Sequence, residues 1–206
     1  MIDDIGATDA NASPLMVYNS RLDRANSDLN VPHRVIVSWL YQLPIKFDGW
    51  KETMFGGWQI NGILTLSDGL PFDLSSPNTT NCCGSRPDRI GNGSLPDDQR
   101  TIDRWFDTTA FREPGFLQFG NAGRNILQGP GTKQLDFSTF KKFRFASEGR
   151  WLEFRAELFN LLNTPQFNNP NGSVGSPAFG RITSAGSPIS FQRTSRQVQF
   201  GLKLYF

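Results

Sequence analysis

The chain has 206 residues with 21 basic and 19 acidic side chains, and this near balance without a basic stripe argues against a nucleic-acid-binding protein. No run approaches about 18 apolar residues, so no transmembrane helix is predicted. The 18 Phe residues, together with 20 Gly and 13 Pro, favour an all-β fold with many turns.

The chain is expected to begin as loop, because Pro and Asn recur through residues 14–32, with a short strand near Leu15–Tyr18. Apolar and polar residues then alternate with a period of two in segments that we predict to be strands. These are His33–Leu43, Gly56–Ser67, Lys133–Phe145, Arg150–Leu162 and Thr194–Phe206. We expect Leu70–Phe72 to extend the second strand after a kink, Pro44–Phe55 to be a turn, and Asp103–Thr108 to form one helical turn.

The segment Arg150–Leu162 fits two patterns. Its apolar residues also recur at helical spacing, and periodicity alone favours an amphipathic helix. The four residues of Ala146–Gly149 are a tight turn that joins it to a clear strand. We therefore predict the second arm of a β-hairpin.

The last strand has one apolar and one mostly polar face. Its apolar residues lie two apart: Val198, Phe200, Leu202, Leu204 and Phe206. Gln197, Gln199 and Lys203 point to the opposite side. A soluble sheet covers such an apolar face with a second layer, whereas an outer-membrane barrel turns it to lipid.

The connections between the predicted strands are alternately short and long, at about 12, 65, 4 and 31 residues. Outer-membrane barrels have short periplasmic turns and long external loops. This pattern predicts an antiparallel meander that forms a partial, open outer-membrane β-barrel. Residues 44–55 and 146–149 would be periplasmic, and 68–132 and 163–193 would be the two long external loops.

The sequence shows no catalytic set, metal site or cofactor motif, so we do not expect an enzyme. His33 is the only histidine, and no Gly-x-Ser-x-Gly motif occurs. The acidic residues of the long loop match no calcium-binding loop; they are Asp97, Asp98, Asp103 and Asp107. The adjacent Cys82 and Cys83 lack the spacing of a zinc site, and a vicinal disulfide, pairing elsewhere or free thiols all stay open.

Two groups of side chains are candidates for function. Lys142, Glu153, Arg155 and Glu157 are expected to face the lumen, because a charge on the lipid side costs about 2–4 kcal/mol at mid-membrane. Lys141 falls on the apolar face and is acceptable only near an interface. The aromatic residues of the long loop either contact a ligand or form a small loop core: Trp105, Phe106, Phe111, Phe116 and Phe119.

Several stretches together resemble the C-terminal barrel region of TonB-dependent outer-membrane receptors, in the branch with a carboxypeptidase-regulatory-like N-terminal domain. They are Val31–Ser38, Gly57–Ile63, Ser67–Phe72, Trp105–Phe111, Phe119–Asn125, Arg155–Asn163 and the closing strand. Their order and spacing, more than any single stretch, carry the resemblance. It covers nearly all of residues 1–206, which would then be a C-terminal fragment of such a receptor.

The resemblance implies energised transport of a large or scarce solute through a plugged barrel of about 22 strands in the bacterial outer membrane. The expected partners are outer-membrane lipid, the barrel-assembly machinery that recognises the terminal Phe206, and a TonB-type coupling protein that acts on an N-terminal region. The start, Met1–Thr8, does not look like a signal peptide, so we expect sequence upstream. The alternative is a secreted β-sandwich that binds carbohydrate.

Overall fold

The computed structural model describes residues 23–80, 84–144, 150–186 and 194–206. The chain divides into two compact units. The sheet unit comprises residues 33–67, 132–166 and 189–206, and the loop unit comprises residues 1–32, 68–131 and 167–188. In the described part of the chain, no helix is both long and apolar enough to cross a membrane.

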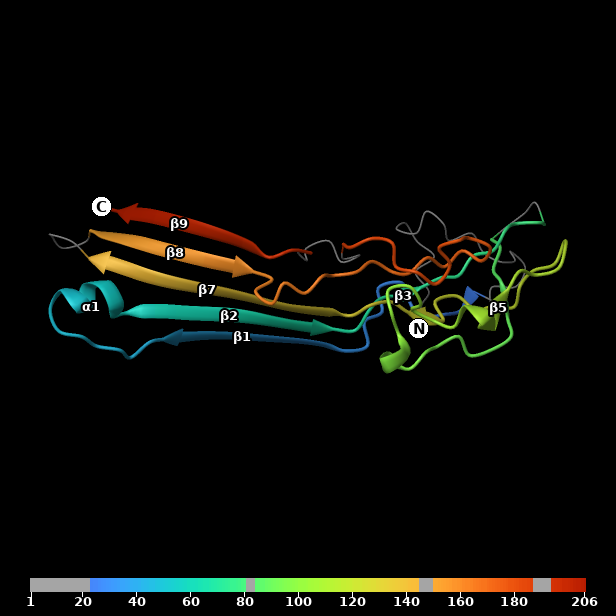
Figure 1. The fold of residues 1–206 in the computed structure, drawn as a ribbon, viewed down its shortest axis with the longest axis horizontal. Helices are drawn as coiled ribbons and strands as arrows, with labels where there is room; N and C mark the ends of the chain where they lie inside the picture. The colour runs from blue at the N-terminus through green and yellow to red at the C-terminus, as the bar shows by residue number, and fades with distance from the viewer. Residues whose placement is uncertain (1–22, 81–83, 145–149, 187–193) are drawn as a thin grey trace. The chain divides into compact units, whose positions relative to one another are not determined.

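The sheet unit is a five-stranded antiparallel sheet in the order β1-β2-β7-β8-β9, in which every neighbour is the next long strand along the chain (Figure 1). The strands are β1 (Arg34–Gln42), β2 (Trp58–Ser67), β7 (Thr132–Arg144), β8 (Trp151–Phe159) and β9 (Gln197–Tyr205). This confirms the five predicted strands and the meander. Both outer strands, β1 and β9, are sheet edges, so the described sheet is open.

The register places most apolar residues of the five strands on one face, although Ile36, Leu40 and Ile63 lie on the other. Along one row, Val37 lies opposite Leu64, which lies opposite Leu135. Along another row, Phe154 lies opposite Leu202. Because a shift by one residue would move a whole strand's apolar set to the other face, this pattern fixes the pairing.

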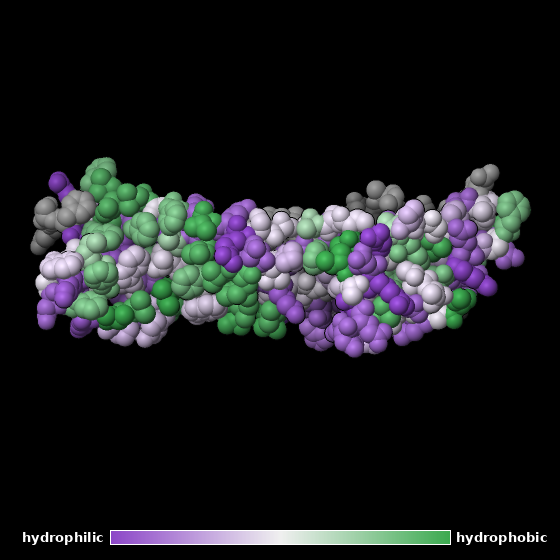
Figure 2. Space-filling view, viewed as in Figure 1, coloured by the Kyte–Doolittle hydropathy of each residue, from purple (hydrophilic) through white to green (hydrophobic). Residues whose placement is uncertain are grey.

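That face is largely exposed at the edge strands, and Figure 2 shows apolar side chains gathered along the sheet unit. In β9, Phe200 is 70% exposed and Leu202 is 65% exposed. A β-sandwich would bury these side chains against a second sheet. The alternative of a two-layer sandwich is therefore wrong, and the partial barrel is confirmed.

Three local predictions are corrected. Pro44–Phe55 contains a helix, α1 (Trp50–Phe55), rather than only a turn. Pro71–Phe72 (β3) does not extend β2 but pairs with Leu127–Gln128 (β6) in a separate small sheet. The helical turn expected at Asp103–Thr108 lies further on, as the 3-10 turn η3 (Thr108–Ala110).

The β8 strand confirms the choice of strand over helix for Arg150–Leu162, although it ends at Phe159. Cross-strand pairing with β7 and β9 on both sides supplies hydrogen bonds that outweigh the local helical spacing. The expected strand near Leu15–Tyr18 and the turn at 146–149 lie outside the described residues.

The loop unit has a small core of its own. Its buried members come from the two ends and the middle of the 68–131 segment: Phe72, Leu74, Phe106, Ala110, Phe111 and Leu127. A second short sheet pairs β4 (Asp88–Arg89) with β5 (Phe111–Arg112), and a 3-10 turn, η2, covers Asp97–Gln99. An isolated bridge between Ser75 and Ser173 joins the two long loops, and a second bridge, between Phe167 and Ala185, lies within the later loop.

Candidate functional site

The polar face of the sheet unit carries the predicted lumen residues. Lys142 lies opposite Glu153, and Glu153 lies opposite Lys203, so a carboxylate stands between two amines across three strands. Glu153 is 5% exposed and accepts a 2.5 Å bond from Arg155 Nε. Glu157 follows on the same face, opposite Gln199. Of these charges, Glu153 and Arg155 form an ion pair.

Aromatic rings support the cations of this face. The Arg155 guanidinium lies 4.9 Å from the centre of the Phe140 ring, and Lys142 Nζ lies 5.7 Å from that of Trp151. The Trp151 ring stacks on Tyr205 at 4.7 Å. Planar contacts of this kind hold a long cationic side chain in one orientation.

A hollow of about 820 Å³ lies over this end of the polar face. Strand side chains on its floor include Gln59, Phe140, Lys142 and Arg155, and Glu52 and Thr53 of α1 also line it. Its lining mixes amides, two carboxylates, cations and two aromatic residues. Such a surface fits a polar protein segment or a hydrated solute rather than an apolar ligand.

Lys141 is, with the exposed Lys133, a charged residue on the apolar face, and the structure shows how Lys141 is accommodated. It lies opposite Trp58 and Phe154 and is 3% exposed. Its ammonium donates to the carbonyl oxygen of Gly56, with Glu52 O at 3.5 Å. The rings of Trp58 and Phe143 flank it at 5.6 and 5.3 Å. The sequence pattern does not reveal these partners, because it predicts only a turn at Pro44–Phe55, where α1 lies.

The predicted aromatic loop residues separate into buried and exposed groups. Phe106 and Phe111 are buried in the loop core, with ring centres 5.9 Å apart. Trp105 packs against that core and donates from Nε1 to Gln128 O at 2.8 Å. Phe119 is half-buried, whereas Phe116 is 79% exposed. The structure therefore does not gather the five side chains into one binding surface, and ligand contact stays a prediction for Phe116.

The four loop aspartates considered for calcium do not converge on one point. Asp97 pairs with Arg100, Asp103 with Arg181, and Asp107 with Arg104, at 2.9, 2.6 and 3.2 Å. Asp107 also accepts a 2.8 Å bond from the Thr109 hydroxyl, which is the main reason that its pKa lies below the ordinary value. Cys82 and Cys83 lie outside the described residues.

A second polar cluster holds together segments far apart in the loop unit. Arg124 pairs with Asp28 at 2.8 Å and lies 3.7 Å from Asp73, and the Asn125 amide donates to Asp73 at 2.6 Å. Burial raises the pKa of Asp73, although Asn125 and the nearby arginines oppose this effect. Nearby, Arg86 forms a buried 2.5 Å pair with Asp23. Sequence patterns do not reveal such pairs, because their members lie far apart in the chain.

A single-layer sheet with one exposed apolar face and one charged, ring-supported face is the wall of a membrane β-barrel. The chain belongs to the family described as "Outer membrane beta barrel domain", whose model matches residues 1–199. No curated protein and no solved structure matches the chain. It is thus an outer-membrane β-barrel protein, located in the bacterial outer membrane.

Proposed function

We propose that this chain is the C-terminal wall of a TonB-dependent outer-membrane receptor that transports a large or scarce solute. The observation that carries the proposal is the open sheet with a charged inner face. Backbone groups of a membrane sheet must all be paired, so the edges β1 and β9 require further strands. The smallest single-chain barrels have about eight strands.

The inner face supports a wide barrel with protein inside it. In a narrow barrel, side chains fill the interior, whereas this face carries several charges, among them the Glu153–Arg155 pair, and a hollow of about 820 Å³. A plug domain would meet this wall through Lys142, Glu153 and Arg155. The family resemblance of the sequence supports the same function, and energy would come from a TonB-type partner that acts on the N-terminal region.

The exposed loop side chains are where a solute would first meet such a receptor. Among the five candidate aromatic residues of the long loop, Phe116 has the most exposed side chain. An aromatic face binds sugars and flat apolar solutes, so Phe116→Ala should weaken solute binding, whereas Ile102→Ala, which removes an exposed aliphatic side chain elsewhere in the loop, should not.

The test uses purified outer membranes from cells that express this protein. The folded, heat-modifiable band that carries its peptides should run well above 23.1 kDa and contain a plug sequence. The solute is identified as the compound that these cells deplete from the medium. Its uptake should stop when the TonB-type coupling protein is deleted. A band without a plug, or uptake that is unchanged by the deletion, would contradict the proposal.

A further inference from the structure

The helix α1, in the connection between β1 and β2, is amphipathic although it has only six residues. At about 100° per residue, Trp50, Lys51, Met54 and Phe55 occupy one arc, and Glu52 and Thr53 occupy the other. Glu52 and Thr53 line the polar hollow. The apolar arc points elsewhere: Trp50 is 69%, Met54 51% and Phe55 55% exposed.

The approach to the helix extends this apolar arc. Ile45 and Phe47, which precede α1, are 44% and 41% exposed, and the Phe47 ring meets Phe55 edge to face at 6.2 Å. The Phe47 amide donates to the Glu52 carboxylate at 2.6 Å. This hydrogen bond holds the backbone of the preceding segment against the polar side of the helix. The Phe47 and Phe55 rings therefore stay on the apolar side.

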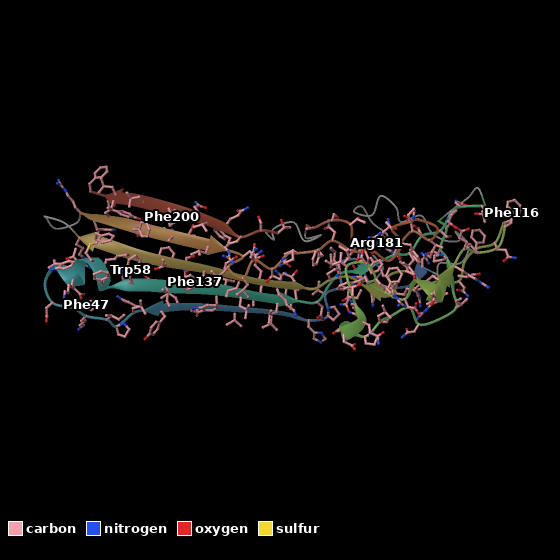
Figure 3. All side chains as sticks on the ribbon, viewed as in Figure 1. Phe47, Trp58, Phe116, Phe137, Arg181 and Phe200 are labelled. Atoms are coloured by element: carbon pink, nitrogen blue, oxygen red, sulfur yellow. The ribbon has the colours of Figure 1, made fainter. Side chains whose placement is uncertain are left out.

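Two side chains of the lipid-facing sheet surface hold the helix. Trp58, the first residue of β2, donates from Nε1 to Met54 O at 3.3 Å. Lys141 donates to the carbonyl of Gly56, directly after the helix. Both donors lie in one row with Phe154 and Leu202 on the apolar face. Figure 3 shows Trp58 beside α1, with Phe47 on the connection that leads to it.

We propose that residues 45–55 are a membrane-interface anchor, in which the apolar arc of α1 lies among phospholipid headgroups and the adjoining acyl chains. Continuity with the lipid-facing sheet surface identifies the occupant, because the helix is attached to that surface by Trp58 and Lys141. Trp, Phe and Met favour this depth, and Lys51, in the middle of the arc, reaches lipid phosphates. Lys141 supplies a donor to the Gly56 carbonyl at the C-terminal end of the helix.

The test compares two positions on the same helix. In the whole outer-membrane protein with Cys82 and Cys83 changed to Ser, Met54→Cys and Thr53→Cys each carry an environment-sensitive fluorophore. The proteins are reconstituted in phosphatidylethanolamine–phosphatidylglycerol vesicles that contain a lipid spin-labelled near the headgroup or near the chain end. The Met54 label should be quenched by the headgroup-proximal spin roughly twofold more than the Thr53 label.

Unchanged strand content by circular dichroism shows that each labelled protein is folded, and Trp50→Cys replaces Met54→Cys if that variant does not fold. Equal quenching of the two labels would overturn the anchor. So would a Met54 label that neither spin-labelled lipid quenches, because it would place the arc in water or against protein. Stronger quenching by the chain-end spin would also overturn it, because the helix would then lie below the interface.

Discussion

Asn160 combines complete burial, a left-handed backbone conformation and several hydrogen bonds. It is fully buried with a positive φ of 51°, and its side chain bonds the Thr164 amide and carbonyl at 3.0 and 2.9 Å. Its own amide donates to Asp136 at 2.8 Å. Asparagine tolerates the left-handed conformation and also supplies both bonds, so it closes the turn that follows β8.

Asn160→Ala should lower the free energy of unfolding by about 1–3 kcal/mol, because it leaves buried polar groups unpaired and strains the backbone. Asn160→Gly relieves the backbone strain but does not restore the lost hydrogen bonds. Its free energy of unfolding should therefore lie between that of Asn160→Ala and that of the wild type. The urea midpoint of the folded band in detergent measures this order. Leu162→Ala, in the same turn and 60% exposed, is the control and should change little.

Two loop aspartates should have opposite effects on the pH dependence of stability. Burial raises the folded-state pKa of Asp73, so its contribution is present below the unfolded pKa and is lost as pH rises through the folded value. The Thr109 bond lowers the pKa of Asp107, so its contribution is present above the unfolded pKa and is lost as pH falls.

Asp73→Asn should therefore reduce the loss of loop-unit stability as pH rises above the ordinary aspartate pKa of about 3.9, and Asp107→Asn should reduce the loss on acidification below that value. A fluorophore on Phe116→Cys, in a chain without Cys82 and Cys83, reports the urea midpoint of the loop unit at each pH. If both substitutions changed the pH dependence of the urea midpoint in the same direction, the opposite pKa shifts assigned to Asp73 and Asp107 would be refuted.

At the scale of the element, β9 tests the assignment of the two faces. Phe200→Lys places a charge on the lipid side of the closing strand and should cost about 2–4 kcal/mol of folding free energy in a bilayer. Gln199→Lys, one residue earlier on the polar face, is the matched control and should cost little. The yield of folded band at graded urea measures both, and equal losses would mean that the two faces are reversed or equivalent.

The terminal residue of the same element should act during assembly. Phe206 is 97% exposed and follows four apolar residues at a spacing of two. Phe206→Ser in the complete protein should lower the amount of folded barrel in the outer membrane, because the assembly machinery is expected to recognise this end. Tyr205→Ser, on the other face, should lower it less, and immunoblots of unheated and heated samples compare the two.

Strands were predictable from the sequence because one face of β1, β2 and β9 carries apolar residues at nearly every second position, and β7 keeps this period at Leu135, Phe137 and Phe143. The helix α1 was not, since it has six residues and begins after Gly49, which offers no capping side chain. The β3 pairing was missed because its partner β6 lies more than fifty residues away. For the charged strand residues, the alternation of apolar and polar positions predicted the face of the sheet on which each lies. The partners of Lys141 and Arg124 were not predictable, because they depend on tertiary contacts.

At the scale of the whole molecule, the sheet gives an orientation to be tested. The α1 connection joins β1 and β2 at one end of the sheet, and the long connection 68–131 leaves β2 at the other end (Figure 1). With α1 periplasmic, Phe116→Cys should react with an impermeant thiol reagent on intact cells. Asp48→Cys should react only after the outer membrane is permeabilised, and the reverse pattern would invert the topology.

The bridge between Ser75 and Ser173 spans 98 positions in the sequence, and the pair of Arg181 with Asp103 spans 78. Synthesis and translocation deliver the chain from its N-terminus, so residues 68–131 arrive well before 167–188. Contacts of such long range form slowly, because a large loop must close first. The loop unit therefore completes its fold only after β7 and β8 have been delivered, and until then its aromatic core lacks the Val174 and Phe179 side chains that pack against it.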